Sequence, residues 1–136
     1  MNRYLLDTNV VSELRKPRPH GSVVSWLGRL QDEQIFLSAV TVGELQSGIE
    51  RTRRQDPHKA SEIELWVDQL ADSYQILSMD TACFREWARL MENKGDHLLE
   101  DAMIAATARV HGLTVATRNE RDFFQLGVPI HNPFKN

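Results

Sequence analysis

The chain has 136 residues, which is enough for one domain built around one hydrophobic core. Hydrophobic residues make up 41% of it and charged residues 26%, a balance that excludes a disordered, collagen-like or coiled-coil chain. The 16 Lys and Arg residues against 19 Asp and Glu residues give a formal net charge of −3. Any contact with nucleic acid must therefore come from a local site, because bulk charge would repel it.

Cysteine content and hydropathy indicate where the protein works. Cys83 is the single cysteine, so the chain cannot form an internal disulfide. No apolar run approaches the roughly 18 residues that cross a bilayer. The apolar run Tyr4–Leu6 before Asp7 is too short for the core of a signal peptide. We therefore expect a single domain over residues 1–136 that is cytoplasmic and has no membrane segment.

Five short apolar runs have the character of β-strands. They do not alternate strictly with polar residues, which favours strands buried on both faces of a parallel sheet. The five runs are Tyr4–Leu6, Ile35–Leu37, Gln75–Leu77, Leu113–Ala116 and Val128–Ile130.

Helical spacing of apolar residues predicts helices between these strands. One helix is expected to begin near Ser38 or Thr41 and to end before Pro57, and another spans Leu98–His111 with Gly112 as its C-terminal cap. Strands that alternate with helices predict an α/β fold with a mainly parallel, five-stranded sheet and helices on both faces. The remaining apolar stripes are Val23, Leu27 and Leu30; Ile63, Trp66, Val67 and Leu70; and Phe84, Trp87, Ala88 and Met91.

Four acidic residues fall at equivalent places in this pattern. Asp7 directly follows the first strand, Glu44 lies early in the helix after the second, and Asp122 follows the fourth. Asp101 lies near the start of the helix that leads into the fourth strand. Because the carboxyl ends of parallel strands meet at one edge, we expect the four carboxylates to converge there.

Helix phase supports a buried position for Asp101. Asp101, Ile104, Ala105 and Ala108 lie on one helix face, so a carboxylate heads an apolar stripe. A first-turn Asp that interacts with the helix dipole is the ordinary alternative. Glu100 is rotated by roughly 100° and is expected to face elsewhere.

Glu44 has two small residues on its helix face, Ser47 and Gly48, which leave room for a close approach by a ligand or another backbone. A solvated charge on an amphipathic helix is the ordinary alternative.

Crowded carboxylates need a counter-charge, and oxygen ligands without a Cys or His cluster favour Mg²⁺ or Mn²⁺ over zinc. Such ions bind phosphates, so the pattern indicates phosphodiester hydrolysis without a protein nucleophile.

Several segments together resemble the PIN-domain ribonucleases, in particular the VapC-type toxins of bacterial type II toxin–antitoxin systems. The matching segments occur in the family's order and cover essentially the whole chain. They are Leu5–Leu14, Leu37–Leu45 with Gly48 and Ile49, Asp101–Ala108, Thr117–Phe123, and Gly127–Ile130 with Asn132 and Pro133.

The resemblance implies a PIN fold and a Mg²⁺- or Mn²⁺-dependent endoribonuclease, with tRNA as one candidate substrate. The family's acidic positions map onto Asp7, Glu44, Asp101 and Asp122, which would be the catalytic and metal-binding residues. Water activated by the metal would attack phosphorus in line and leave 5′-phosphate and 3′-hydroxyl ends. The supporting polar residues would be Thr8, Asn9, Thr117 and Asn119, although helix N-capping explains Thr8 and Asn119 equally well.

The resemblance also implies a cognate antitoxin that obstructs the acidic site, and a homodimer of the toxin. The segment before Asp101 is more acidic than in many relatives, which leaves the roles of Asp96 and Glu100 open.

Basic residues near the acidic edge have two interpretations. The groups after the first and fourth strands could hold RNA phosphates or could be ordinary surface charge. The polar stretch Arg51–Lys59 is expected to be an exposed turn, where surface charge is the favoured interpretation. The three groups are Arg15, Lys16 and Arg18; Arg51, Arg53, Arg54 and Lys59; and Arg118 and Arg121.

Two other functions compete with the nuclease. A non-catalytic PIN-like module would bind RNA or protein without cutting, but it would not need all four carboxylates. A signalling receiver also gathers acidic residues at a sheet edge. It would accept phosphate on an Asp after its third strand, where this chain has Asp80, and would need a Lys after its last strand, where only Lys135 is found.

Overall fold

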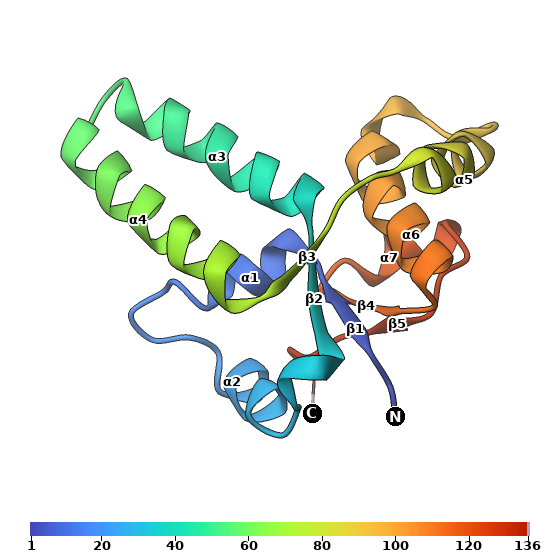
Figure 1. Ribbon diagram of the computed structural model, residues 1–136, viewed down its shortest axis with the longest axis horizontal. Coiled ribbons are helices and arrows are strands. Elements are labelled where there is room, and N and C mark those ends of the chain that lie inside the picture. The colour runs from blue at the N-terminus through green and yellow to red at the C-terminus, as the bar shows by residue number, and fades with distance from the viewer. Residues whose placement is uncertain (136) are drawn as a thin grey trace.

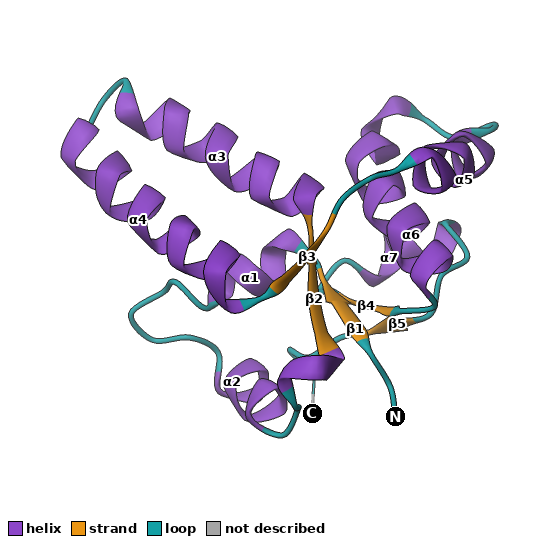
Figure 2. Ribbon diagram, in the orientation of Figure 1, coloured by secondary structure: helices purple, strands orange, loops and turns teal. Residues whose placement is uncertain are grey.

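The computed structural model describes residues 1–135. Its strands form one parallel sheet in the order β3-β2-β1-β4-β5, with β1 between β2 and β4 (Figures 1 and 2). The expected five-stranded parallel sheet is confirmed. The strands are β1 (Tyr4–Leu6), β2 (Ile35–Ser38), β3 (Gln75–Leu77), β4 (Thr114–Ala116) and β5 (Ile130–His131).

Helices flank the sheet on both sides, as the sequence predicts. In Figure 1, α3 and α4 extend together as a pair away from the sheet, while α5, α6 and α7 gather on its other side. Among residues 1–135, no helix is both long and apolar enough to cross a membrane. The helices are α1 (Thr8–Glu13), α2 (Gly21–Gly28), α3 (Ala39–Arg53), α4 (Pro57–Ser73), α5 (Thr81–Met91), α6 (Leu99–His111) and α7 (Glu120–Gln125), with 3₁₀ turns η1 (Asp32–Gln34) and η2 (Asp96–Leu98).

The central strand β1 has apolar side chains on both faces. Leu5 packs into a cluster with residues of α6 such as Ile104, and Leu6 packs into a second cluster with Val10 of α1 and Trp26 of α2. Successive side chains of a strand point to opposite faces, so both faces of β1 are buried. This burial explains why the strand runs are apolar without alternation.

Two helix ends follow the expected capping chemistry. The Ser38 hydroxyl accepts the Val40 backbone N–H at 3.0 Å, so α3 begins directly after β2. Gly112 ends α6 with a φ of +67°, a conformation that glycine adopts without steric cost.

The last strand differs from the prediction over Val128–Ile130. It comprises Ile130 and His131, which pair with Val115 and Ala116. Val128 is buried in the core instead of forming part of the ladder. Its apolar character therefore reports packing next to the strand, which is why the sequence placed the strand too early.

The α5 stripe also differs from the prediction. Phe84 is 47% exposed and Ala88 lies on the surface, whereas Cys83 is fully buried. Trp87 and Met91, the other two predicted members, do pack against the core. The helix is therefore rotated away from the predicted face, with an apolar strip left on the surface.

The stretch Arg51–Lys59 is not one continuous turn. Residues up to Arg53 belong to α3, and α4 already begins at Pro57. Pro57 occupies the first helical turn, where its missing N–H costs nothing, and the Asp56 side chain caps the helix by accepting the Lys59 N–H at 3.1 Å. The exposed connection is therefore only three residues long.

Candidate active site at the carboxyl edge of the sheet

Asp7 leaves β1 at the centre of the sheet edge and caps α1. Its carboxylate accepts the Thr8 backbone N–H at 2.8 Å, the Thr117 hydroxyl at 2.8 Å and the Asn9 side-chain amide at 3.1 Å. Only 5% of Asp7 is exposed. Burial raises its pKa above the usual range, although the hydrogen bonds from Thr117, Thr8 and Asn9 act in the opposite direction.

Asp101 and Asp122 are joined by one amide. The side-chain NH₂ of Asn119 donates to Asp101 Oδ2 at 3.2 Å and to Asp122 Oδ2 at 2.9 Å. Asn119 also donates its backbone N–H to the Thr117 hydroxyl at 2.9 Å, which links this pair to Asp7. Asn119 stands at the N-cap position of α7, yet its side chain makes no capping bond there.

Charge and burial act together on Asp101. Burial is the largest cause that raises the pKa of Asp101 to about 6, and the negative charges of Asp7, Asp122 and Glu100 add to the rise. The negative charge of the Asp101 carboxylate is therefore only partly compensated by its neighbours within the protein.

Glu44 reaches the same edge from the second turn of α3. The Thr8 hydroxyl donates to Glu44 Oε1 at 2.9 Å and lies 3.1 Å from the Thr41 hydroxyl. Burial raises the pKa of Glu44 to about 7, and a hydrogen bond with Glu100 and the charges of Glu100 and Asp7 contribute to the rise.

The expected orientation of Glu100 is therefore wrong. The Glu100 side chain is exposed, yet it forms a hydrogen bond with the Glu44 carboxyl group, and α3 is in contact with α6. Helix phase gives the direction of a side chain but not the neighbour that lies in that direction.

The sequence prediction also missed the buried residue Thr41. Its place three residues before Glu44, on the same helix face, was a usable signal.

All eight predicted site residues belong to one connected polar network. Two threonines and two asparagines hold the four carboxylates in place, and no ion pair of residues 1–135 involves those four carboxylates. The members are Asp7, Glu44, Asp101, Asp122, Thr8, Asn9, Thr117 and Asn119.

The chemistry of the donors fits a hard divalent cation. The network offers carboxylate, hydroxyl and amide oxygens with no Cys or His, as Mg²⁺ and Mn²⁺ prefer. Within residues 1–135, no three His, Cys, Asp or Glu side chains converge closely enough to hold an ion as they stand. The carboxylates are instead spaced by their neutral donors, and it is the type of donor and the uncompensated negative charge that favour a cation here.

Comparison with known proteins identifies the family. The model of the PIN domain matches residues 4–128. The chain belongs to the PIN-domain family. Among its relatives, it is 34% identical to Toxin FitB of Neisseria gonorrhoeae, with 96% of this chain and 97% of that protein covered. It is 35% identical to VapC ribonuclease Y4jK of Sinorhizobium fredii, with 96% and 97% covered.

Solved structures show the same fold in this PIN-domain family. FitAcB from Neisseria gonorrhoeae superposes on the chain with a TM-score of 0.86 at 35% identity, covering 98% of this chain and 99% of that one. FitAB bound to an IR36 DNA fragment gives a TM-score of 0.84 at 33% identity, covering 98% and 96%. The predicted PIN fold is therefore confirmed over essentially the whole chain.

Proposed function

We propose that this PIN-domain protein is the toxin of a toxin–antitoxin pair and acts as a Mg²⁺- or Mn²⁺-dependent endoribonuclease. The observation that carries the proposal is the set of four carboxylates linked by neutral donors, with raised pKa values at Asp7, Glu44 and Asp101 and no ion pair to any of the four among residues 1–135. Relatives of 34–35% identity are named as a toxin and as a ribonuclease, which supports the same activity.

Each part of the network has a role in this proposal. Asp7 and Asp101 would be direct ligands of the cation, and Glu44 and Asp122 would complete the site directly or through water. A bound divalent cation supplies a nucleophilic water at neutral pH and stabilises the charge of the phosphate and the leaving oxygen. Asn119 fixes the two carboxylates that it bridges, and Thr117 fixes Asp7.

The test is brief expression of the wild type and of Asp7→Asn in bacteria, followed by sequencing of RNA 5′ ends. Asparagine retains an oxygen to cap α1, so the fold should survive while cleavage is lost. Growth arrest and discrete new 5′-phosphate ends, in tRNA or another RNA, are expected from the wild type alone. Equal cleavage by the variant would overturn the assignment of the site. If the folded wild type binds RNA but never cuts it, the non-catalytic binding module becomes the favoured function.

We also propose that an antitoxin protein binds this chain. The relatives solved as FitAcB and as FitAB bound to DNA are complexes, which supports a partner here. Co-expression with the product of a neighbouring gene should restore growth and yield a stable complex.

The homodimer stays a prediction. The exposed apolar strip of Phe84 and Ala88 on α5 is a surface that a second copy would cover.

A further inference from the structure

A groove leads away from the acidic edge between α1, α3 and α4. Its cavity of about 480 Å³ begins at Thr8 and Glu44, which belong to the polar network, and continues along α3 to Arg51 and Thr52. Apolar side chains, including Ile63 of α4, line part of it. The groove is therefore continuous with the proposed site of cleavage.

Three basic residues from two segments border this groove: Arg15, Lys16 and Arg51. Arg51 donates to the Ser47 hydroxyl at 3.1 Å, and Lys16 pairs with Glu13 at 2.9 Å. Within residues 1–135, no side-chain hydrogen bond or ion pair engages the exposed Arg15 guanidinium. Since the chain as a whole carries a charge of −3, this positive border is a local feature.

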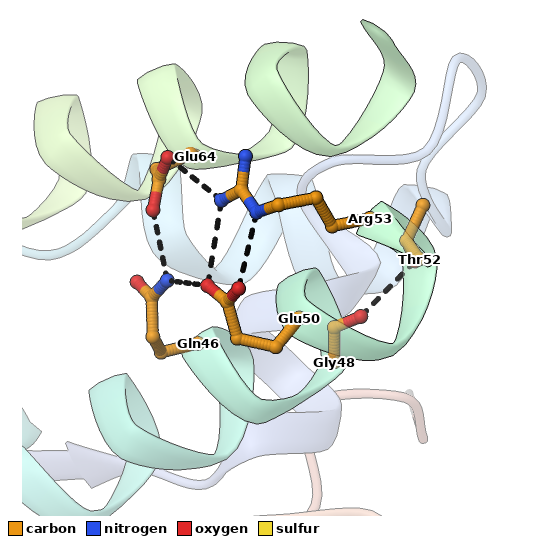
Figure 3. Close-up of polar contacts among 6 residues, drawn as sticks. All are labelled: Gln46, Gly48, Glu50, Thr52, Arg53 and Glu64. Atoms are coloured by element: carbon orange, nitrogen blue, oxygen red, sulfur yellow. Dashed lines mark hydrogen bonds and ion pairs between the residues drawn. The ribbon is translucent and has the colours of Figure 1, made fainter. Parts of the chain in front are cut away.

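The neighbouring arginine Arg53 has a different role. Its guanidinium donates to Glu64 at 2.9 Å and to Glu50 at 3.0 Å, and Gln46 completes this network between α3 and α4 (Figure 3). Arg53 is therefore paired with two carboxylates. Arg51, two residues earlier on α3, has no carboxylate partner in residues 1–135. The expected exposed turn is wrong at Arg51, because this residue lies within α3 and borders the groove. Whether its charge is ordinary surface charge or an RNA contact is what the tests below decide.

Gly48 lines the groove one helical turn beyond Glu44, on nearly the same face of α3. A Cβ atom built there would meet only the end of the Arg51 side chain, at 3.7 Å. Internal packing therefore does not require glycine at this position, although glycine in a helix interior is unfavourable. The missing side chain leaves space on the groove side, where a ligand backbone can come close to α3.

We infer that the groove holds the phosphodiester backbone of a single-stranded RNA segment next to the scissile bond, with its phosphates at Arg15, Lys16 and Arg51. This inference rests on the proposed nuclease function. Positively charged grooves that run along the sugar-phosphate backbone are a general way of binding single-stranded nucleic acid. A duplex is too wide for a cavity of this size, and single-stranded segments are also the usual targets of specific RNA recognition.

The first test removes the three charges and compares them with three closely matched ones. The groove variant is Arg15→Ala, Lys16→Ala and Arg51→Ala. Its control is Arg85→Ala, Arg89→Ala and Arg29→Ala, away from the groove. Arg89 pairs with Glu86 at 2.9 Å as Lys16 does with Glu13, Arg29 donates to the Ser25 hydroxyl at 3.0 Å as Arg51 does to Ser47, and Arg85 is exposed like Arg15.

Both sets are made in an Asp101→Asn background to prevent cleavage, and binding of a fluorescent single-stranded oligoribonucleotide is followed by anisotropy over a salt series with Mg²⁺ present. The groove variant should bind about tenfold more weakly or worse. Its slope of log K against log salt should fall by about 2, because each phosphate contact on a single strand contributes about 0.7. Equal affinities and slopes in the two sets would overturn the inference.

A second test does not depend on charge or on the Glu13 ion pair. Gly48→Ala and Gly43→Ala both replace a glycine inside α3, and a Cβ atom at Gly43 has nothing within 4 Å and lies outside the groove. Both variants should unfold at a higher temperature than the wild type. Only Gly48→Ala should bind the RNA more weakly, by a few-fold. Equal RNA binding by the two variants would contradict a close approach at Gly48.

These outcomes separate the groove from the nuclease. A wild type that cleaves RNA would overturn the groove and keep the nuclease if the groove substitutions leave RNA binding normal in the Asp101→Asn background and leave cleavage normal when Asp101 is intact. A wild type that never cleaves, with binding lost only in the groove variants, would overturn the nuclease and keep the RNA groove. If the variants lose the antitoxin complex but bind RNA normally, the groove is a protein-binding surface and the inference is wrong.

Discussion

Two glutamates on α3 show how one helix serves two purposes. Glu50 is held by Arg53 and Gln46, and these partners lower its pKa below the usual range. Glu44, six residues earlier, faces the sheet edge, where burial and the Glu100 carboxyl raise its pKa to about 7. Arg53 supplies a counter-charge to Glu50 on one face of α3, whereas no ion pair among residues 1–135 involves Glu44 on another face. The first arrangement fixes α3 to α4, and the second leaves negative charge for a cation to neutralise.

The largest effect that tests this contrast is expected from Asp101→Asn. Cleavage should fall by more than about 100-fold, beyond the range usual for residues that only support a metal ligand. Stability without divalent cations should rise by about 1 kcal/mol after allowance for screening by water, because a carboxylate with a raised pKa is removed. Single-turnover cleavage and thermal unfolding measure the two effects. A variant that is inactive and also clearly less stable would contradict the idea of uncompensated charge.

The next effect is expected from Asn119→Ala, which removes the amide that joins Asp101 to Asp122. Affinity for Mn²⁺ should fall by about 10- to 100-fold, since residues that orient metal ligands have effects of that size. Isothermal titration with Mn²⁺ measures it, and Asn93→Ala, at a surface turn, is the control. Unchanged Mn²⁺ affinity would show that the bridge does not position the ligands.

The third effect is a dependence of stability on pH that has opposite signs in the two regions. Asp101 and Glu44 have pKa values raised to about 6 and about 7, against about 4 in an unfolded chain. Between these values the folded state holds protons that the unfolded state has released. The stability they contribute is therefore full below about pH 4 and is lost as the pH rises through 6 and 7.

Glu50 and Glu64 have lowered pKa values, so their contribution is present above about pH 4 and is lost as the pH falls below it. Thermal unfolding measured across this range without divalent cations should show the decline towards pH 7, and Mg²⁺ should reduce it. A midpoint that stays constant from pH 5 to about 7 in the absence of metal would contradict the raised pKa values.

The smallest effect is expected from Arg53→Ala in the network of Figure 3. Loss of its two ion pairs should lower the unfolding midpoint by about 2 °C, because exposed ion pairs contribute little even in a network. RNA cleavage should remain normal. Arg54→Ala, next in the chain and exposed, should leave both properties unchanged. Strong loss of cleavage in Arg53→Ala would mean that the network acts on the site and does not only join α3 to α4.

The sequence by itself determined much of the site. Asp7 follows an apolar run, Ser38 and Gly112 are capping residues, and the spacing of Asp101 with Ile104 places it on an inward face. These are local properties, because strand and helix geometry act over a few residues. They suffice to bring the four carboxylates to one edge of a parallel sheet.

Only the tertiary structure decided which neighbours meet. Glu100 reaches Glu44 because α6 packs against α3, and Arg51 borders the groove while Arg53 is bound to Glu64 of α4. Phe84 lies on the surface although its spacing suits a core stripe. Sequence periodicity gives the direction of a side chain from its own helix, but the element that lies opposite is fixed by packing between segments far apart in the chain.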